Sequence, residues 1–564
     1  MPRKLLVVAA LVLVHAPIAM ARPTQVMPGV TFEHRIAGTP AGPLSTYVIT
    51  APRPGGLYSL TPLLSNDTIT GRETVSSMER RVSSRMTTIG VNGDFFNWVG
   101  GWPSGLLMRG GTLEHQPIEN RSAVGIDTSG NLHVDRVPFN GTWSGFSTIS
   151  YRLAYVNEPP QANTASLFTP VWGAATPSVN GVAAVIEPFP AAQPFHNLTG
   201  PVTAVISNSS VPIPRDGAVL VARGTAAEVV RADAFVGGSV TVDFGLRPDW
   251  SSVTDAVGGG PALVRDGKPI ANAGEALTPV QLYGRDPRTA IGQRADGRIV
   301  IVAADGRRPG WSVGITNLDL ALTLIRAGCV NGFALDSGGS TTVAFDGRVL
   351  NWPSDPTGER PVGEALVIGY TGVFVPAPAP TLSPNGDRVG DSEALTYKLV
   401  RPSTVSAKLI APDRSERELD AGVKQPGIHR LAWNGTDEAG APAPEGAYRW
   451  SVTATDDLGR TSSAARTFTL DKTLGFVRVS RNARTIRFSL ARDAKIRVAI
   501  EDRYGDILRT VAKGSRHTGI VTAHWNGRDG RRKRVPSGSY VVRVAATSAI
   551  GLSEVRLPLR IRHG

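Results

Sequence analysis

The sequence contains a single cysteine among its 564 residues, Cys329, so no disulfide can form within the chain. Its nine histidines show no His-x-His or His-x-x-x-His spacing, which argues against a histidine-based zinc site. Beyond the N-terminal segment no apolar run is long enough to span a bilayer, which takes about 20 residues. We therefore expect a protein held together by its hydrophobic core, with Cys329 serving as a small buried apolar residue.

Acidic residues are scarce relative to basic ones. The chain has 47 Asp and Glu against 60 Lys and Arg, which gives a formal net charge of +13. Such a charge favours attraction to polyanions such as teichoic acids, other phosphorylated glycans or anionic lipid head groups. Nucleic acid is disfavoured, because the densest basic run, residues 528–534, has no interleaved aromatic side chains on which bases could stack. A solvated loop without a partner is the alternative for this run.

The N-terminus has the three parts of a secretory signal peptide. Arg3 and Lys4 are basic, residues 5–14 are apolar, and residues 19–21 end in a small-residue cleavage pattern. We expect cleavage after Ala21 and a secreted, extracellular protein, for which association with the cell wall is a further hypothesis. The alternative, a short membrane anchor, is disfavoured because the apolar run is shorter than the roughly 20 residues that a spanning helix needs.

The chain divides into a large N-terminal region and a repetitive C-terminal one. Residues 22–373 alternate short apolar runs with Gly, Pro and Asn turns, and helical periodicity is found only at 65–86 and 316–327. In the second of these segments Thr316 is a cap, and Leu318, Leu322 and Ile325 fit one apolar face. This pattern predicts a sheet-rich α+β domain with a few helices. Residues 374–380 form a Pro/Ala linker, which we expect to be extended.

Beyond the linker the chain repeats itself. Trp433-Asn434-Gly435 recurs at 525–527, and the Gly-Ala-Tyr at 446–448 recurs as Gly-Ser-Tyr at 538–540, with an offset of 92 residues in both cases. About ninety residues of alternating strands is the size of an immunoglobulin-like sandwich. We therefore expect two all-β Ig-like domains, residues 381–470 and 471–564, with no catalytic role.

Residues 335–342, Leu-Asp-Ser-Gly-Gly-Ser-Thr-Thr, follow an apolar strand and form the most informative motif. A strand that ends in Asp336 and then turns on two glycines leaves space beside the carboxylate, with the hydroxyls of Ser340, Thr341 and Thr342 around it. This arrangement suits a polar, hydroxyl-rich ligand. The plain alternative is a turn in which Asp336 or Ser337 caps a helix.

Three further segments have the same character. Residues 91–98 carry Asn92 and Asp94, residues 286–292 place Arg288 at the entry to an apolar strand, and residues 299–312 form a strand that ends in Asp305. Several strand ends with Asp, Arg and small residues make a common site more probable than any one of them does. Arg288 could instead pair with Asp286 or Asp305, and the Asp-Gly at 305–306 could be only a turn.

These segments resemble the phosphodiester glycosidase family. The strings DPRTAIGQRADGRIVIVAADGRRPGWSVGIT, NGFALDSGGSTTVAFDGRVLNWPSD and GERPVGEALVI carry the resemblance, and VNGDFFNW, LFTPVWG and VGGGPALVRDGKPI extend it over roughly residues 30–373. The family usually has glycine where Asp94 and Ser337 stand. The two C-terminal repeats resemble the Ig-like domain of flagellar hook-capping proteins.

The resemblance implies a hydrolase that cleaves the glycosidic bond of a sugar 1-phosphodiester, such as an N-acetylhexosamine 1-phosphate, in cell-wall or extracellular glycan, with no required cofactor. Because guanidinium groups bind phosphate oxygens in pairs, arginines would hold the phosphodiester. The expected catalytic residues are Asp336 as nucleophile or base, Asp305 as second carboxylate and Arg288 on the phosphate. The expected substrate-binding residues are Asn92, Asp94, Arg307, Ser340, Thr341, Glu359 and Arg360.

Two other functions remain open at this stage. The chain could be a non-catalytic polysaccharide-binding or adhesion protein, or a phosphodiesterase that cuts the P–O bond, although the latter usually needs a metal cluster that the spacing of His and Asp does not offer. A calcium site is a weaker hypothesis. Asn385, Asp387 and Asp391 could supply oxygens, but the ligand set of an EF-hand is incomplete, and a turn held by side-chain hydrogen bonds is the alternative.

Overall fold

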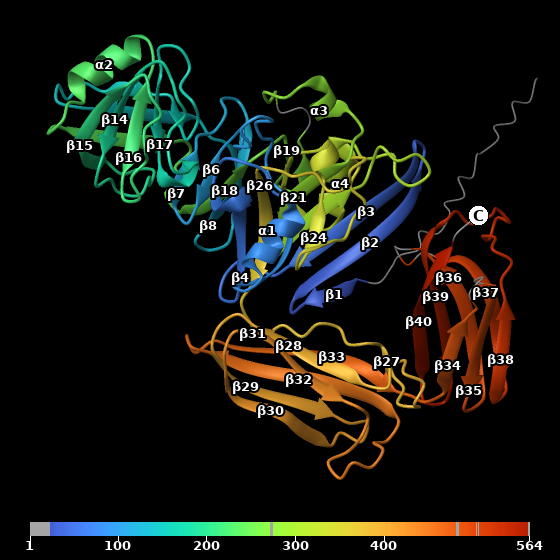
Figure 1. The fold of residues 1–564 in the computed structure, drawn as a ribbon. Coiled ribbons are helices and arrows are strands. Elements are labelled where there is room, and N and C mark those ends of the chain that lie inside the picture. Colours follow the sequence, from blue (N-terminus) through green and yellow to red (C-terminus); the bar gives the residue numbers. More distant parts are fainter. Residues whose placement is uncertain (1–22, 271–273, 481–483, 503–504, 506, 562–564) are drawn as a thin grey trace, which may run out of the picture. The chain divides into compact units, whose positions relative to one another are not determined.

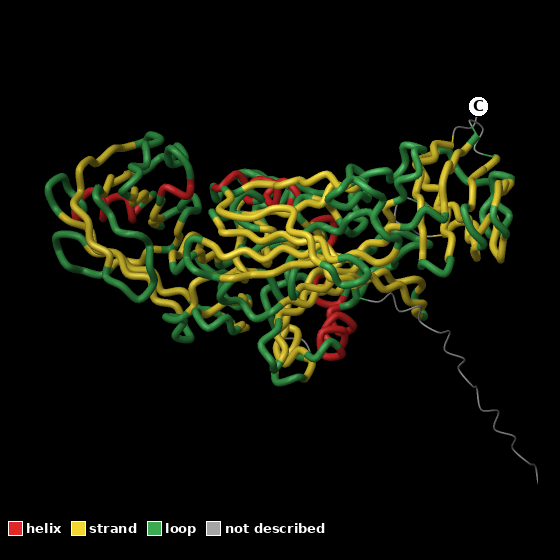
Figure 2. The backbone as a smooth tube through the Cα atoms, turned by 90° about the horizontal axis from the view of Figure 1, so that it is seen from below, coloured by secondary structure: helices red, strands yellow, loops and turns green. Residues whose placement is uncertain are grey.

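The structure, a computed structural model, describes residues 23–270, 274–480, 484–502, 505 and 507–561. The signal peptide predicted for residues 1–21 therefore lies outside the described residues. The chain divides into two compact units, of which the first ends at Tyr370 and the second begins at Thr371. Strands dominate both units, as Figure 2 shows. No described helix is both long and apolar enough to cross a membrane.

Two antiparallel sheets of the first unit contain the strands that carry the sequence motifs. The eight-stranded sheet has the order β1 (Thr24–Met27), β2 (Val30–Thr39), β3 (Gly42–Ala51), β22 (Ile299–Ala304), β21 (Arg288–Arg294), β23 (Cys329–Ala334), β19 (Ala262–Arg265), β20 (Lys268–Pro269). The five-stranded sheet has the order β25 (Arg348–Val349), β24 (Val343–Phe345), β5 (Thr87–Asn92), β26 (Glu364–Tyr370), β4 (Tyr58–Leu64). Both β23 and β5 are interior strands, so the motifs at their ends are fixed by pairing on two sides.

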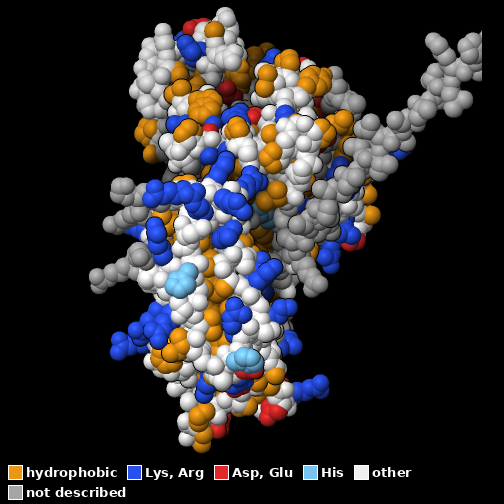
Figure 3. Space-filling model, turned by 90° about the vertical axis from the view of Figure 1, so that its right-hand side faces the viewer, with side chains coloured by type: hydrophobic (Ala, Val, Ile, Leu, Met, Phe, Trp, Pro, Cys, Tyr) orange, Lys and Arg blue, Asp and Glu red, His pale blue; other side chains and the backbone are white. Residues whose placement is uncertain are grey.

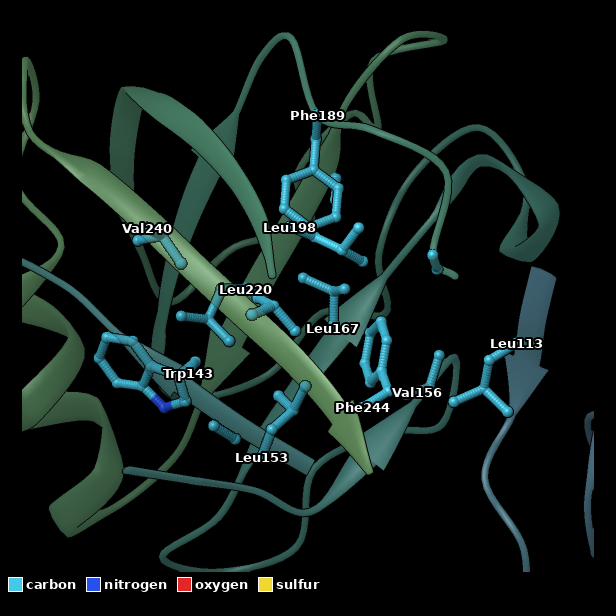
Figure 4. Close-up of a cluster of buried hydrophobic side chains, with 14 of the residues drawn as sticks. Leu113, Trp143, Leu153, Val156, Leu167, Phe189, Leu198, Leu220, Val240 and Phe244 are labelled. Atoms are coloured by element: carbon cyan, nitrogen blue, oxygen red, sulfur yellow. The ribbon is translucent and has the colours of Figure 1, made fainter. Parts of the chain in front are cut away.

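Two more sheets complete the first unit. A five-stranded sheet has the order β7 (Thr112–His115), β6 (Leu107–Arg109), β18 (Val253–Gly258), β8 (Ser122–Asp127), β9 (Leu132–Arg136). An eight-stranded sheet has the order β11 (Tyr151–Leu153), β10 (Phe139–Ser144), β17 (Ser239–Leu246), β15 (Leu198–Ser207), β14 (Val182–Ile186), β16 (Ala218–Ala222), β13 (Ala165–Phe168), β12 (Tyr155–Val156). Figure 4 shows side chains that are buried against the eight-stranded sheet containing β14 and β17, among them Trp143, Leu220 and Phe244.

Four α-helices and three short 3₁₀ turns are found among the described residues of the first unit. The helices are α1 (Val75–Val82), α2 (Thr225–Asp233), α3 (Pro279–Tyr283) and α4 (Asn317–Arg326), and the turns are η1 (Ser65–Asp67), η2 (Pro170–Trp172) and η3 (Gly338–Ser340). Helix α4 packs Leu320 and Leu324 on the sheet that contains β21 to β23. The side chain of Thr316 caps it by accepting from the Asp319 N–H. The helix predicted for residues 316–327 is thus confirmed.

The helix expected over residues 65–86 is shorter than predicted. Only α1 is α-helical there, and Met78 and Val82 pack under β24 and β26. Asn66 has a positive φ of 53°, so the preceding residues form a turn that cannot continue into a helix. The sheet-rich architecture with few helices, expected from the sequence, is confirmed at this coarse level.

The second unit consists of two strand-only halves (Figure 1). In the first half β27 (Thr381–Leu382), β33 (Thr461–Leu470), β32 (Gly446–Asp456), β29 (Ser403–Ile410) and β30 (Glu416–Lys424) form one sheet, and β28 (Glu393–Leu399) and β31 (Gly427–Trp433) the other. In the second half β34 (Leu474–Val479), β35 (Thr485–Leu490) and β38 (Gly519–His524) face β37 (Ile507–Arg516), β36 (Ala494–Glu501), β39 (Gly538–Thr547) and β40 (Leu552–Ile561). Trp433 and Trp525, the repeated tryptophans, are each buried in the core of their half.

The start of the second unit differs from the predicted boundary. Residues 374–380 were expected to be a linker, but Val373 and Val375 are each 1% exposed and belong to the core of the first Ig-like half. Phe374 pairs with Lys398 of β28 through two backbone hydrogen bonds. The apolar residues just before Pro376 therefore serve as part of the sandwich.

Candidate active site

The site lies where strands β5 and β23, from different sheets, end side by side. The Asp336 N–H donates to the Gly93 carbonyl (3.0 Å), and Asn92 Nδ2 donates to the Asp336 carbonyl (2.9 Å). The other side of the amide, Asn92 Oδ1, accepts from Thr289 Oγ1 (2.8 Å) and the Thr342 N–H (3.3 Å). Asn92, which we expected to bind sugar, thus holds two strand ends together and is fully buried.

Asp336 follows β23 and lies at this junction of the two strand ends. Its side chain is 7% exposed, Oδ1 accepts from the Ser337 N–H (2.7 Å), and the carboxylate is hydrogen-bonded to Ser340. Burial raises the pKa of Asp336 to about 7, and the charge of Asp94 adds to this, while the bonds from Ser340 and Ser337 oppose it. A carboxyl group that titrates near neutral pH can exchange a proton in a catalytic cycle.

Asp94 is a second buried carboxylate of the site. Its oxygens accept from the Phe95 N–H and the Gly105 N–H, both at 2.7 Å. Burial raises the pKa of Asp94 to about 6, against the opposing charge of Arg121 and these N–H donors. The carboxylate lies in a slot between Gly105 and Gly258, where a Cβ on Gly258 would come within 2.3 Å of Oδ2. Gly105, which precedes β6, and Gly258, which ends β18, therefore provide the space for Asp94.

Glu364, which sequence reasoning did not select, is the third carboxyl group. It begins β26, is 1% exposed, and its Oε1 accepts from the Asp94 N–H (3.0 Å). Burial, followed by the charge of Asp94, raises the pKa of Glu364 well above its usual range. Its Oε2 is buried without a hydrogen-bond partner among the described residues. The acid opens the apolar string EALVIGY, and this break in the pattern was the available signal.

Arg360 and Trp98 lie next to the Asp-Ser-Gly-Gly-Ser turn. Arg360 donates to both oxygens of Asp355 (2.7 and 2.9 Å) and, through Nη1, to Ser340 Oγ at 3.4 Å. Its guanidinium lies 5.1 Å from the ring centroid of Trp98, which is 62% exposed. A Cβ at Gly339 would clash with Arg360, which explains the second glycine of the turn. An exposed indole offers an apolar ring face together with one polar N–H.

Arg121 is a cation near Asp94, and sequence reasoning missed it. Nη2 donates to the Ala276 carbonyl (3.0 Å), and the guanidinium lies 5.3 Å from the Phe95 ring centroid. Its Nε and Nη1 are buried and have no hydrogen-bond partner within the described part of the chain. Two unused donors on one guanidinium can bind the oxygens of an anion. No motif surrounds Arg121, so only its position in the fold reveals it.

His115, at the end of β7, completes the polar surroundings of Asp94. It is fully buried, and Nδ1 lies 2.8 Å from the Gly105 carbonyl and 2.9 Å from that of Gln116. Because both partners are acceptors, Nδ1 carries the proton. Nε2 lies 3.5 Å from Glu158 Oε2 and makes no hydrogen bond to another described residue.

Asp305, expected as the second catalytic carboxylate, has its oxygens occupied. It is 1% exposed and accepts from four groups, which are Tyr47 Oη (2.7 Å), Trp311 Nε1 (2.9 Å), Asn351 Nδ2 (3.1 Å) and the Trp352 N–H (3.1 and 3.3 Å). Burial raises its pKa despite these donors. This carboxylate fixes Trp311 and Trp352, and we leave it out of the proposed chemistry.

The expected phosphate-binding arginines are also engaged. Arg288 is 3% exposed, and its guanidinium donates to the carbonyl oxygens of Ile315 (3.1 Å), Gly284 (2.7 Å) and Val280 (3.4 Å). These bonds tie α3 to the sheet. Arg307 donates to both oxygens of Asp286 (2.6 and 2.8 Å). Its guanidinium lies against Gly338, so it borders the turn that follows Asp336.

Of the remaining residues expected to bind substrate, some lie within the site and one lies outside it. Glu359 accepts from the Ser76 N–H (2.9 Å) and Ser76 Oγ (2.5 Å), so it caps the N-terminus of α1. Ser340 contacts both Asp336 and Arg360 within the site. Thr341 Oγ1 is buried without a hydrogen-bond partner among the described residues, while its carbonyl accepts from Asn351.

The loop considered for calcium is held by its own side chains. Asp391 accepts from the N–H groups of Asn385, Gly386 and Arg388, at 2.8 to 2.9 Å. Asp387 Oδ1 accepts from the Val389 N–H. In the described part of the chain no cluster of three or more His, Cys, Asp or Glu side chains could hold a metal ion. The hydrogen bonds account for this turn without an ion, and calcium there stays a hypothesis.

Comparisons with known proteins agree with this division of the chain. Residues 195–369 match the family profile "Phosphodiester glycosidase", and residues 389–457 and 479–549 match the "FlgD Ig-like domain" profile. The first match contains Asp336, Arg360 and Glu364, whereas Asp94 and Arg121 precede it.

Individual relatives are more distant. An uncharacterized protein, YomE, of the SPbeta prophage in Bacillus subtilis (strain 168) is 43% identical over 108 residues, which is 19% of this chain and 16% of that protein. A hypothetical protein from Synechocystis has a similar fold, with a TM-score of 0.53 and 22% identity over 63% of this chain and 64% of that one. The zebrafish N-acetylglucosamine-1-phosphodiester alpha-N-acetylglucosaminidase catalytic domain matches with a TM-score of 0.32 and 12% identity, over 61% and 84% of the two chains.

The chain spans less than two thirds of the length of the Bacillus and Synechocystis proteins. The Synechocystis structure supports the fold alone, and the zebrafish likeness is too weak to support a function. The two family profiles are the stronger findings, and they agree with the resemblance read from the sequence. The chain therefore carries a segment that matches the phosphodiester glycosidase family, followed by two segments that match the FlgD Ig-like domain.

Proposed function

We propose that this protein is an exported hydrolase that cleaves the glycosidic bond of a sugar 1-phosphodiester in cell-wall or extracellular glycan. The family domain supports a glycosidase-type activity. The observation that carries the proposal is the buried carboxyl cluster of Asp336, Asp94 and Glu364, with the Arg121 and Arg360 guanidinium groups around it. Export rests on the signal-peptide pattern of residues 1–21, and the wall context on the net charge of +13.

Asp336 is the proposed nucleophile or water-activating base. Hydrolysis of this bond passes through an oxocarbenium-like transition state, in which an oxygen approaches the anomeric carbon as the bond to the phosphate oxygen breaks. The ionised form of Asp336, present at and above pH 7, either attacks that carbon or takes the proton of the attacking water. The phosphate monoester leaves with the bonding electron pair and needs little help from an acid.

The neighbouring groups would stabilise charge and hold the sugar. Arg121, with two unused donors, is the proposed phosphate-binding cation, and it takes the role first assigned to Arg288. The raised pKa of Glu364 favours its protonated form, which can donate to a sugar hydroxyl or an N-acetyl oxygen. Trp98 would stack on a sugar face.

Isotope labelling tests the reaction type. The full-length protein is incubated with a small sugar 1-phosphate diester in ¹⁸O water, and the products are analysed by mass spectrometry. Label in the sugar is the expected result, because water then adds to the anomeric carbon. Label in the phosphate would mean P–O cleavage, and the absence of turnover would favour the alternative of a polysaccharide-binding or adhesion protein.

The same assay tests the role of Asp336. Asp336→Asn keeps the size of the side chain but cannot act as nucleophile or base, so kcat should fall by about 10²-fold or more while KM changes little. Asp296→Asn is the matched control, because Asp296 lies in an exposed turn away from the site and should leave kcat unchanged. A folded Asp336→Asn protein with nearly normal kcat would disprove the assignment.

A further inference from the structure

The second Ig-like half has a groove on its four-stranded sheet that no step of the proposed chemistry uses. The groove has a volume of about 1350 Å³. Five of its lining residues are cations, and none of the described lining residues is acidic or aromatic. The cations are Lys495, Arg497, Arg509, Lys513 and Arg543. Figure 3 shows a face on which Lys and Arg side chains far outnumber those of Asp and Glu.

Strand register brings several of these cations onto one face. In β36 the side chains alternate, so Ile496 and Val498 enter the core while Lys495 and Arg497 are exposed on the opposite face. Arg497 pairs directly with Lys513 of β37. Lys495 and Arg497 are two residues apart, which in a strand separates them by about 6.6 Å. The result is a row of positive charges along the sheet.

Most of this charge is uncompensated. Arg543 forms ion pairs with Glu554 and with Glu501, the latter at 3.5 Å. Lys495, Arg497, Arg509 and Lys513 have no acidic partner within ion-pair distance among the described residues, in contrast to Arg543. Like charges held close together repel one another, so such a cluster weakens the domain unless an anion binds to it.

The first Ig-like half shows that the fold itself does not require these cations. Strand β29 corresponds to β36, and the positions equivalent to Lys495 and Arg497 are Thr404 and Ser406. On this face Lys408 is paired with Glu416 at 2.9 Å, and Ser406 donates to Glu418. The second half thus places cations where the first half has small hydroxyl side chains on the same framework.

We propose that this groove binds a phosphodiester-linked glycan and holds the protein on an anionic polymer. Spaced cations along a strand match repeated phosphates, and the absence of aromatic lining residues disfavours single-stranded nucleic acid, which binds by stacking its bases. The choice of a phosphodiester glycan over other polyanions rests on the proposed function of the first unit. The inference that the groove binds a polyanion does not depend on that function.

Charge reversal with a matched control tests the groove. The double variant Arg497→Glu/Lys513→Glu reverses two charges inside it. Arg478→Glu/Arg487→Glu reverses two exposed and mutually paired arginines on the opposite sheet of the same half, so both variants have the same net charge. Affinity of each full-length protein for a soluble poly(glycerol phosphate) is measured over a range of salt concentrations.

The groove variant should bind about tenfold more weakly or worse, with a smaller salt dependence, because fewer counterions are released. The control should bind like the unaltered protein. Equal losses in both variants would mean that net charge alone acts and would overturn the proposal. Tighter binding of the unaltered protein to an oligonucleotide with the same number of phosphates would overturn it in favour of nucleic acid.

Turnover of a small diester separates this proposal from the proposed function. The groove variant should retain normal kcat/KM on that substrate, because the altered residues belong to a different unit. If no protein turns over the diester but the groove variant alone loses polymer binding, the hydrolase proposal fails and the groove stands. If all proteins turn over the diester and the groove variant binds the polymer normally, the hydrolase proposal stands and the groove proposal fails.

Discussion

At the scale of single residues, the buried carboxyl of Asp336 reduces stability. Its pKa of about 7, against a usual value near 3.8, means that the folded state resists ionisation. Between these values the unfolded chain has already lost the proton, so the folded state loses stability as pH rises from about 4 through 7. At 1.36 kcal/mol per pKa unit the full effect is about 4 kcal/mol. Such a cost is typical of catalytic groups.

Asp336→Asn should therefore stabilise the protein at high pH. Asparagine does not titrate, so the variant avoids the cost of a buried charge, and its Tm should exceed that of the unaltered protein by a few °C at pH 8. Near pH 4 both carry a neutral side chain, and the difference should vanish. Thermal unfolding followed by circular dichroism at both pH values measures this. A difference that is constant with pH would show that Asp336 ionises normally.

Arg121 and Arg288 should differ in what their loss affects. Arg121→Gln removes a cation with two free donors, so KM for the diester should rise and kcat should fall, together by about tenfold or more, with stability nearly unchanged. Arg288→Gln breaks bonds to buried carbonyl oxygens and should cost about 1–3 kcal/mol of stability with little effect on KM. Steady-state kinetics and urea unfolding compare the two, and the reverse pattern would restore Arg288 as the phosphate ligand.

At the scale of secondary-structure elements, the end of β18 determines where Asp94 lies. Gly258 ends that strand, and the Asp94 carboxylate occupies the space where a side chain would be. Gly258→Ala should displace Asp94 and lower kcat/KM by about 10- to 100-fold, the range expected when a group of an active site moves by an ångström. Gly38→Ala in β2 is the control, since a Cβ there meets nothing within 4 Å. Equal activity of both variants would show that the slot is not needed.

The elements also show where local signals suffice. Helix α4 was predicted with its cap, because Thr316 and the apolar residues that follow it lie within the same dozen residues. The buried face was predicted wrongly, since Leu318, expected on the apolar face, is 58% exposed, whereas Leu320 and Leu324 are buried. The segment at 65–86 has similar periodicity, but its first part bonds elsewhere. Asn66 N–H donates to Glu73, and Arg81 donates to Glu73 and to the Leu64 carbonyl. Because these groups bond to the neighbouring loop and strand, the residues before α1 do not form the first turns of a longer helix.

At the scale of the whole molecule, the two units should separate by function. A protein that ends at Tyr370 should keep normal kcat/KM on a small soluble diester, because every proposed catalytic group precedes that residue. On an anionic polymer it should act more slowly than the full chain, since the second unit no longer raises the local substrate concentration. A large loss on the small diester by a truncated protein that is folded would place part of the site in the second unit.

The sequence by itself determined the architecture and the position of Asp336. Strand, turn and cap signals are local, so the sheet-rich first region and α4 could be read from neighbouring residues. The two Ig-like domains could be read from motifs that recur 92 residues apart. The motif around Asp336 is local too, because a strand end, two glycines and three hydroxyls occur within eight residues.

Only the tertiary structure decided which groups gather around Asp336. The bond between the Asp94 N–H and Glu364 joins residues 270 positions apart, and Arg121 reaches the same place from a segment without any motif. The sequence also could not reveal that the oxygens of Asp305 are already occupied, because one of its four donors, Tyr47, lies 258 residues away. Whether a buried carboxylate is free to react depends on how many donors the fold brings to it, and strand pairing between distant segments sets that number.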